Sequence, residues 1–521
     1  MSDVDRAPRS AERPRRVDGA HWVMAFCCAL AVPFYLLASR AQWFYQDEFN
    51  FLMNPAESVD DLLRPSNEHL MITTRILYRI NWELFGLTRY EPYQIWAILA
   101  HVALAAMIYL VLRRVGVDPW LATALGVLFL AFGKGHSNIT WAFQVGFAGS
   151  VTAGYAQLLL ADHDGTNRWR DVLALFAGFA AVTGSAPGQV MVGVVALAIF
   201  LRRGWRAAAV QTIPLIAIYL VWSTLYPSTS RSSPLGEIPG FVGRAFIHLG
   251  DRAALHPLLA GLVVSMAVVG LVLIAQQRTP SQLLRDHALP LSLMVGGLVF
   301  IVATAYGRAA MPADFASLDR YSHVLLAITL PLVGVGLQGL VTRRRQLLVP
   351  LIVVLLSAVP ANLRAIEVKE NRYATAEVIM GVAQSPLLEE MHPSNRPFEG
   401  LTGMRWIHVG WLLELHRSGE IPSIEVGSDA QQLVDEALAV DVSPTGGRRM
   451  LCQEWPAGEQ IVLSVGESQD FAGTVTVDSE RDGEELRSRE IHKRLPHRLT
   501  AMVDDIQITL SPGPGDQPVL C

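Results

Sequence analysis

Several features that mark common protein classes are missing from this chain. Its 521 residues contain no Gly-rich phosphate-binding loop, no internal repeat of fixed period and no low-complexity tract. The first absence argues against a nucleotide-linked substrate. Cysteine is scarce, with 4 residues in all. Cys27 and Cys28 lie in an apolar segment, where a small apolar role suits them, so Cys452 and Cys521 are the pair that could form a disulfide.

Charged side chains are nearly missing from a series of long apolar runs, which recur from residue 21 to about residue 361. Apolar runs of this length, separated by short polar loops, indicate a polytopic membrane protein that is mainly α-helical. We place about eleven spans at 21–40, 93–112, 119–132, 143–161, 171–184, 188–201, 207–225, 257–275, 288–306, 321–340 and 347–361. The break at 185–188 could make two of the shorter segments a re-entrant hairpin.

The distribution of Lys and Arg predicts the orientation of these spans, whereas the net charge of -5 says little. Residues 1–20 are polar and Arg-rich without a small-residue cleavage pattern after them, so we expect a retained anchor with a cytoplasmic N-terminus. Alternate loops carry the basic residues Arg113, Arg114, Arg168, Arg170, Arg202, Arg203, Arg206, Arg278, Arg285, Arg343, Arg344 and Arg345. Basic loops tend to stay in the cytoplasm. The other, longer loops and the C-terminus are therefore expected outside it.

The sequence divides into a cytoplasmic tail at 1–20, a membrane domain at 21–361 and an extracytoplasmic region at 362–521. The last region is expected to be mainly helical up to about residue 450. Alternating residues and turn signals then predict strands of a small antiparallel unit at 460–465, 473–477 and 505–510. An oxidising compartment would permit the Cys452–Cys521 disulfide, although two cysteines alone do not establish it.

The first long loop, about 41–92, contains an acidic pair, Asp47-Glu48, among aromatic residues just past the first span. Carboxylates at a membrane boundary are costly to hold and are functional candidates by default. The alternative is that the pair only caps or solvates the loop. Ser58 could cap a short helix together with Asp61. Residues 70–87 carry apolar side chains at helical spacing, which predicts an amphipathic helix along the membrane interface.

Two later outer loops are rich in basic residues. In the loop at 226–256, four residues recur every fourth position and share one helix face: Arg244, His248, Arg252 and His256. The loop at 307–320 holds Arg308 and Arg320. Arginine suits phosphate because its fork of donors binds two oxygens and stays charged. The alternatives are contact with anionic lipid headgroups or ordinary snorkelling at the interface.

The order of these features resembles the GT-C superfamily of integral-membrane glycosyltransferases, which use polyprenyl-phosphate-linked sugars. The resemblance rests on the segments QDEFNFL, LLRPSNEHL, RILYRINWELFGL and a later GR…DRY, and on their placement in outer loops. It covers the membrane region and leaves the C-terminal region unmatched. It implies a GT-C-like helix bundle in a bacterial plasma membrane, with an active site outside the cytoplasm.

In that family an acidic residue of the first outer loop is associated with catalysis, and basic residues of outer loops hold the donor phosphate. The resemblance therefore implies Asp47 or Glu48 as general base, with Arg308 and Arg320 on the phosphate. The pair is Asp-Glu where Asp-Asp is more usual, which leaves the acting carboxylate open. Because adjacent side chains point in different directions, we expect Asp47 to be the base and Glu48 to orient the acceptor or pair with a cation. Direct displacement would invert the anomeric centre.

Further residues are candidates for the same site. His69 could bind the donor phosphate or the acceptor hydroxyl, with Glu68 or Asn67 setting its tautomer. The other candidates are Tyr321, Arg244 and Arg252 for the donor phosphate and Glu68, Asn138, Trp141 and Gln144 for the acceptor or sugar, with Gln189 a weaker one. Trp141 also suits an interfacial anchor. A metal site of Asp47, Glu48 and His69 matches no dedicated motif, so we assign no metal or cofactor, and a divalent-cation requirement stays open.

Three functions compete. The first is transfer of one sugar, by resemblance mannose or arabinose, from a polyprenyl-phosphate donor to a glycan, glycolipid or protein of the cell envelope, with no nucleic-acid partner. The second is a transporter or flippase for lipid-linked saccharides. A transporter should carry ionisable residues within its spans, where His101 is a rare example. The third is a non-catalytic envelope scaffold, in which the loop carboxylates are dispensable.

Overall fold

The computed structural model describes residues 18–521 apart from 67, 166, 228–232, 254–256, 312, 367–371, 399–403, 405, 446–451, 457–458 and 514–517. Residues 1–17, Asn67 and His256, which figure in the expectations above, lie outside the described residues.

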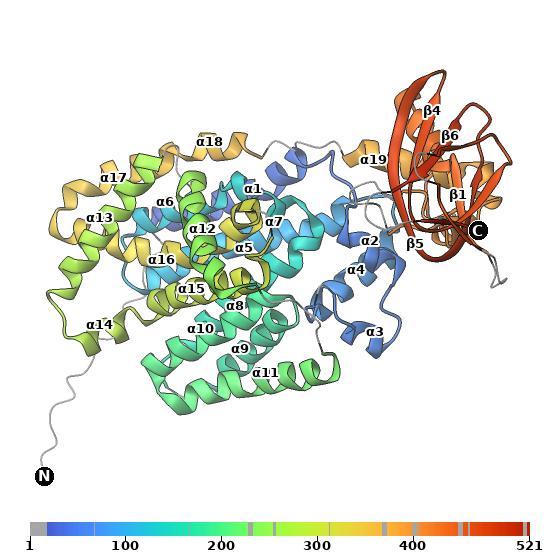
Figure 1. The fold of residues 1–521 in the computed structure, drawn as a ribbon. Helices are drawn as coiled ribbons and strands as arrows, with labels where there is room; N and C mark the ends of the chain where they lie inside the picture. Colours follow the sequence, from blue (N-terminus) through green and yellow to red (C-terminus); the bar gives the residue numbers. More distant parts are fainter. Residues whose placement is uncertain are drawn as a thin grey trace, which may run out of the picture.

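Long apolar helices form a bundle that makes up most of the molecule (Figure 1). Within the described ranges, 8 helical segments are long and apolar enough to cross a membrane: α1 (Gly19–Ala38), α5 (Glu91–Arg114), α10 (Ala186–Arg203), α11 (Trp205–Leu225), α13 (Pro257–Ala275), α15 (Ala288–Arg308), α16 (Asp319–Arg343) and the stretch Arg345–Arg364. That stretch comprises η5 (Arg345–Leu347), α17 (Leu348–Ser357) and α18 (Val359–Arg364). The mainly α fold and the multi-pass character expected from the sequence are confirmed.

Three of the expected spans correspond to shorter helices. They are α6 (Pro119–Leu130), α8 (Val145–Ala161) and α9 (Arg168–Val182), with 12, 17 and 15 residues. At about 1.5 Å of rise per residue, such helices are short for a hydrocarbon core about 30 Å thick. The total of about eleven crossings therefore stays a prediction.

Glycines allow the closest contacts between helices. At the break expected near 185–188, residues 183–185 turn the chain from α9 into α10, and a Cβ at Gly188 in the first turn of α10 would overlap the carbonyl oxygen of Ala181. In the same way, a Cβ at Gly270 of α13 would overlap the carbonyl oxygen of Gly336 in α16. Small residues let the backbones of apolar helices approach where bulkier side chains would hold them apart.

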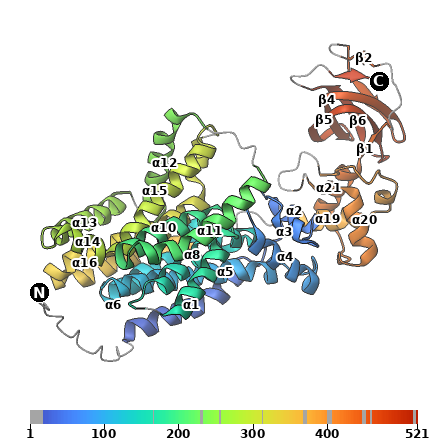
Figure 2. The same ribbon diagram turned by 90° about the horizontal axis from the view of Figure 1, so that it is seen from below.

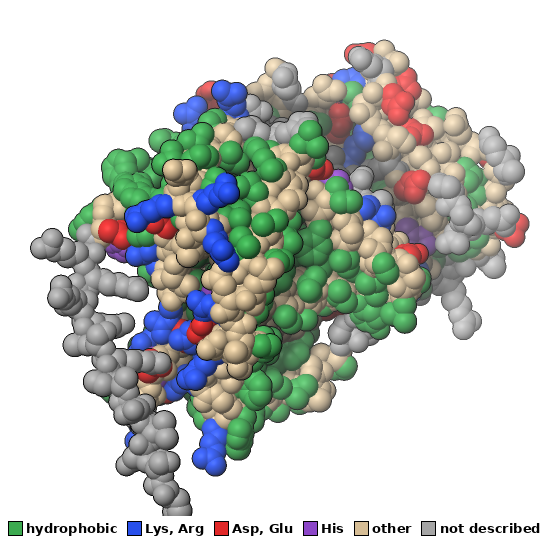
Figure 3. Space-filling view, turned by 90° about the vertical axis from the view of Figure 1, so that its left-hand side faces the viewer, with side chains coloured by type: hydrophobic (Ala, Val, Ile, Leu, Met, Phe, Trp, Pro, Cys, Tyr) green, Lys and Arg blue, Asp and Glu red, His purple; other side chains and the backbone are tan. Residues whose placement is uncertain are grey.

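One end of the bundle carries the arginine-bearing loops and is called here the Arg-rich end. Figure 3 looks at this end and shows basic side chains spread across it, with fewer acidic ones. Asp162, only 1% exposed, pairs there with Arg114 and with Arg202, the latter at 2.9 Å. Arg203 pairs with Asp171 at 2.8 Å. These ion pairs tie α5, α8, α9 and α10 together.

The opposite end, called here the long-loop end, carries the longer connections. They contain α2 (Asp47–Met53), α3 (Val59–Leu63), α4 (Ile72–Phe85), η1 (Gly133–Gly135), α7 (Ser137–Thr140), η2 (Ala142–Gln144), η3 (Leu235–Glu237), α12 (Ile238–Ala253) and η4 (Ala313–Ser317), whereas α14 (Pro280–Asp286) lies at the Arg-rich end. Ser58 and Asp61 form the expected capping box on α3. The side chains of Ile76, Ile80 and Leu84 form an exposed apolar stripe on α4, as an interfacial helix requires.

Helices of the C-terminal region pack against the first long loop. They are α19 (Arg372–Gln384), η6 (Pro386–Glu389), α20 (Val409–Ser418) and α21 (Ser428–Leu438). Their apolar side chains share one core with α2 and α4, in which the rings of Phe49 and Trp411 lie 6.3 Å apart. Figure 2 shows these helices between α2–α4 and the sheet. The chain therefore covers α2 with its own C-terminal helices.

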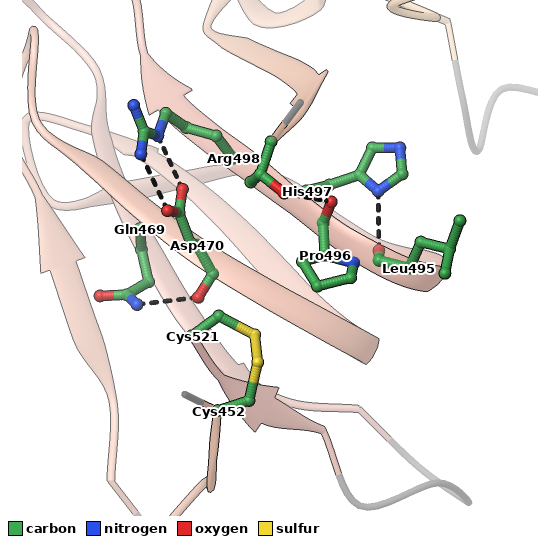
Figure 4. Close-up of a disulfide and its surroundings, with 9 residues drawn as sticks. Cys452, Gln469, Asp470, Leu495, Pro496, His497, Arg498 and Cys521 are labelled. Atoms are coloured by element: carbon green, nitrogen blue, oxygen red, sulfur yellow. Dashed lines mark hydrogen bonds and ion pairs between the residues drawn. A yellow bond between two sulfur atoms is a disulfide. The ribbon is translucent and has the colours of Figure 1, made fainter. Parts of the chain in front are cut away.

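A 7-stranded antiparallel sheet completes the chain, in the order β1-β5-β4-β6-β3, with β7 beside β4 and β2 beside β7. Its strands are β1 (Val440–Pro444), β2 (Gln453–Glu454), β3 (Ile461–Leu463), β4 (Ser468–Arg481), β5 (Glu484–Ala501), β6 (Gln507–Pro512) and β7 (Val519–Leu520). A disulfide between Cys452 and Cys521 fastens the chain end to the segment that begins β2 (Figure 4). Nearby, the Arg498 guanidinium binds both carboxylate oxygens of Asp470, at 2.7 and 2.9 Å.

Candidate functional site

Glu48 is a buried anchor in the first long loop. Its side chain is 0% exposed. The Tyr78 hydroxyl donates to Oε1 at 2.5 Å, and Oε2 accepts from the Trp141 indole at 2.9 Å and from the Tyr45 backbone N–H at 2.8 Å. The Tyr90 hydroxyl lies within hydrogen-bond distance of both oxygens, at 3.2 and 3.3 Å. A buried carboxylate needs such donors to replace water. We expected Glu48 to orient an acceptor or pair with a cation; its carboxylate accepts from the donors named above, and the expected role stays a prediction.

Asp47 begins α2 and is partly exposed. The residue before it, Gln46, has a φ of 49°, a conformation that costs energy for a residue other than glycine and persists only when its surroundings hold it. The bond from the Tyr45 N–H to Glu48 fixes this turn. Successive side chains on a helix point about 100° apart. With Glu48 directed into the core, Asp47 therefore points elsewhere, and the two carboxylates have different environments.

His69 lies within range of the charge of Arg308, a residue from a distant part of the chain. Backbone hydrogen bonds to Ser66, at 2.9 and 3.0 Å, hold His69 in place. Burial and the charge of the Arg308 guanidinium lower the pKa of the His69 imidazole, while Glu68 acts in the opposite direction. Glu68, like Gln46, is a non-glycine residue with positive φ, at 67°. The charge of Arg308 therefore acts on His69 from a distant part of the chain, and the phosphate-binding role of the two residues stays a prediction.

A second basic group surrounds the start of α16. Arg252 of α12 donates to the carbonyl of Lys134 at 3.3 Å. Burial lowers the pKa of Arg252, and the nearby Asp319 carboxylate opposes that shift. Asp319 also accepts from the Ser137 N–H at 2.9 Å. The Asn138 amide donates to the carbonyl of Arg320 at 2.9 Å. The Arg320 guanidinium lies over the Tyr321 ring, 5.3 Å from its centre, so Arg252 and Arg320 are linked here only through the segments that hold them.

The remaining candidates are distributed between core and surface. Arg244 and Glu68 are exposed. Tyr321 is buried against Phe147 and Phe300. The side chains expected to contact sugar are buried in the packing of the second long loop: Asn138, Trp141 and Gln144. We therefore reassign these three to the framework, since they present almost no surface to a ligand.

The described residues contain no group of three or more His, Cys, Asp or Glu side chains placed to hold a metal ion.

Two buried arrangements were not predicted from the sequence. His101 and His323 meet inside the bundle, with Nδ1 of His101 2.9 Å from Nε2 of His323 and Nε2 of His101 3.0 Å from the carbonyl of Leu130. Since that carbonyl only accepts, Nε2 of His101 carries the proton, and Nδ1 accepts from His323. The second is Arg75 of α4, whose buried guanidinium donates to the Ser66 hydroxyl at 2.7 Å. The partners of His101 and of Arg75 are not their neighbours in the sequence, so no local sequence pattern could predict these contacts.

No family model matches the chain, and no curated protein is significantly similar to it. Two solved structures of ArnT from Cupriavidus metallidurans align with most of it. The apo form has a TM-score of 0.46 at 12% identity, covering 82% of this chain and 93% of that one. The form bound to undecaprenyl phosphate has a TM-score of 0.44 at 13% identity, covering 84% and 96%. A likeness this loose assigns neither a fold family nor a function to the chain.

Proposed function

We propose that this protein is a membrane glycosyltransferase of the GT-C type. It transfers a sugar from a polyprenyl-phosphate donor to a cell-envelope acceptor outside the cytoplasm. The position of Asp47 carries the proposal. This carboxylate is partly exposed at the start of α2, directly after the strained residue Gln46, and the hydrogen bonds to the buried Glu48 hold that turn. A fixed position is what a general base needs.

In the proposed reaction the acceptor oxygen forms a bond to the anomeric carbon of the donor sugar. The bond from that carbon to the phosphate oxygen breaks, and its electron pair leaves with the polyprenyl phosphate. The acceptor hydroxyl proton passes to a carboxylate oxygen of Asp47, which later releases it to water. One displacement inverts the anomeric centre. Glu48 takes no proton in this scheme, because its oxygens already accept from Tyr78 and Trp141.

The departing phosphate requires cationic and hydrogen-bonding partners. Arg308 with His69 is our first choice, because α15 ends at Arg308, where a bundle helix meets the long-loop end. The alternative is Arg320 at the start of α16 together with Arg252 of α12, which is near Asp319. Either group would leave the prenyl tail in lipid with its phosphate at headgroup depth.

The proposed orientation places the Arg-rich end in the cytoplasm and the long-loop end outside it. The Cys452–Cys521 disulfide supports this orientation, since such bonds persist in oxidising compartments. The acceptor is a glycan, glycolipid or protein of the envelope. Mannose and arabinose are the sugars that the family resemblance suggests.

The proposal is tested with purified protein in proteoliposomes. Mannosyl and arabinosyl phosphates of a short prenol are supplied with envelope extract as the source of acceptor, and transfer is followed by release of prenyl phosphate. The expected result is acceptor-dependent release with one of the two sugars. Movement of the intact lipid-linked sugar across the bilayer without release would support the transporter instead. The absence of both release and movement would support the scaffold.

A further inference from the structure

Tryptophans with exposed side chains gather at the Arg-rich end of the bundle. Trp22 and Trp120 lie in the first turns of α1 and α6, and Trp169 and Trp205 lie in the first turns of α9 and α11. Their exposed fractions run from 48% to 79%, and that of Trp169 is the highest. Exposed indoles of membrane proteins settle at the level of the lipid headgroups, where one edge of the ring is wet and the other apolar. These four side chains therefore indicate where the Arg-rich end meets the headgroups of one leaflet.

Two of these tryptophans are each next to an arginine with an exposed side chain. Arg168 precedes Trp169, and Arg206 follows Trp205. The guanidinium of Arg206 lies over the Trp205 ring, 5.5 Å from the ring centre. A guanidinium stacked on a ring keeps the N–H donors along its edge available to an anion. Each helix start thus presents a cation together with an indole.

Two acidic side chains at this corner are engaged by other arginines. Arg202 pairs with Asp162 at 2.9 Å, and Arg203 pairs with Asp171 at 2.8 Å. Within the described ranges, no ion pair involves either of the two arginines beside the tryptophans. Two exposed positive charges therefore have no counter-charge from the described part of the protein, and an anion at the membrane surface can supply it.

The starts of α9 and α11 lie at nearly the same depth. The two helices pack side by side at one edge of the bundle and begin at the same end (Figure 1). The Gln211 amide of α11 donates to the backbone carbonyl of Asp171 at 3.1 Å and to its carboxylate at 3.2 Å. Since a helix rises about 1.5 Å per residue, Arg168 lies about 4.5 Å and Arg206 about 7.5 Å along the axis from this contact. One headgroup at this depth is therefore within the range of both arginines.

Exposed apolar side chains continue both helices from this level into the bilayer. Four of them follow Trp169 and Arg206 at four and seven positions, with exposed fractions of 52% to 68%: Leu173, Phe176, Val210 and Ile213. Residues at these spacings share one helix face with the residue that they follow. Each helix therefore offers a cation and an indole at its start and an apolar face below them. A phospholipid has the same order of chemistry, with a charged headgroup above apolar chains.

We propose that the starts of α9 and α11 form a binding site for an anionic phospholipid of the leaflet at the Arg-rich end. Arg168 and Arg206 bind its headgroup, Trp169 and Trp205 lie at the level of its glycerol, and its acyl chains follow the apolar faces of the two helices. The uncompensated charges favour an anionic headgroup over a zwitterionic one. The apolar faces favour a lipid over a soluble phosphate. This site is distinct from the long-loop end and is independent of the proposed function.

Lipid binding to the full-length protein in detergent tests the proposal, with native mass spectrometry to count the lipids bound. The probes are phosphatidylglycerol, phosphatidylcholine with the same acyl chains, and glycerol 3-phosphate. The test variant combines Arg168→Gln with Arg206→Gln. The matched control combines Arg343→Gln with Arg344→Gln, which removes the same charge from exposed residues of the same end, where α16 finishes. Trp169→Ala is a second test variant.

The wild type is expected to bind phosphatidylglycerol at least about fivefold more tightly than phosphatidylcholine. The test pair should lose most of this preference, and the control pair should keep it. Trp169→Ala should weaken the binding of both lipids, because the indole contacts the lipid whatever the charge of its headgroup. Equal affinity of the wild type for the two lipids would overturn the proposal. So would an equal loss in the test and control pairs, which would indicate attraction by the overall charge of this end. Displacement of phosphatidylglycerol by a similar concentration of glycerol 3-phosphate would also overturn it, because the site would then bind a soluble phosphate.

Discussion

Trp141 donates its indole N–H to the carboxylate of Glu48 at 2.9 Å, although 93 positions separate the two residues in the sequence. This bond joins the second long loop to the first. Tyr78 of α4 and Tyr90 at the start of α5 reach the same carboxylate. One acidic side chain thereby fixes the segments that surround Asp47.

Glu48→Ala is expected to destabilise the protein by about 3 kcal/mol or more, because it leaves several buried donors without an acceptor. Thermal unfolding in one detergent measures the effect. Glu57→Ala is the control, since Glu57 is exposed and its contact with Arg79 is long, at 3.9 Å. A melting temperature for Glu48→Ala equal to that of the control would show that the network does not hold the loop.

Gly188→Ala should destabilise the bundle, since the added methyl group overlaps the Ala181 carbonyl oxygen at the turn between α9 and α10. The cost of such overpacking is about 1–3 kcal/mol. Gly193→Ala in the same helix adds a methyl group with no neighbour within 4 Å and should be neutral or stabilising. If both variants melt alike, the close approach of the two helices is not required.

Loss of the Cys452–Cys521 disulfide should loosen the C-terminal sheet. The bridge spans 69 residues, and a loop of that size corresponds to about 4 kcal/mol in the chain-entropy account. Paired Cys452→Ser and Cys521→Ser substitutions are compared with Cys28→Ala by limited proteolysis. Cleavage within the sheet should increase only in the double serine variant. Equal protection of both variants would contradict the expected role.

The pH dependence of stability should include a contribution from His69. Burial and Arg308 hold its folded pKa below the ordinary value of 6.5. Below that value the unfolded chain binds a proton that the folded one resists, so stability is lost as the pH falls. Between pH 7.5 and pH 5, the wild type should lose more thermal stability than His69→Gln. Arg308→Gln should lose less than the wild type, because one cause of the lowered pKa is gone. Identical pH profiles would contradict the proximity of the two residues.

The sequence predicted the features that depend on local pattern. Apolar runs predicted the long helices, the loop arginines predicted the Arg-rich end, and Ser58 with Asp61 predicted the cap on α3. Contacts between residues far apart in the chain could not be predicted from the sequence. The burial of Glu48 depends on Trp141 and Tyr90, and no local pattern distinguishes it from its partly exposed neighbour Asp47.

Strand β5 shows the same limit in the C-terminal region. Its residues Glu484–Ala501 are rich in charge, and Ile491 and Leu499 are buried only because β4 and β1 pair with it on either side. Alternation along the segment is too weak to indicate a strand, so neither β5 nor its partner β1 was predicted. The three predicted strand segments overlap β3, β4 and β6.

The central claim is that Asp47 takes the acceptor proton while Glu48 holds the loop. The most direct test is the single-turnover rate of sugar transfer from a short-chain prenyl phosphate, measured for the wild type, Asp47→Asn and Asp60→Asn. Asp60 is an acidic residue of the same loop, and its carboxylate accepts from the Tyr226 hydroxyl at 2.6 Å.

We predict that Asp47→Asn slows transfer at least about 100-fold, as loss of a general base should, with unchanged affinity for prenyl phosphate. Asp60→Asn should transfer at the wild-type rate. An Asp47→Asn protein that transfers sugar as fast as the wild type would contradict the account.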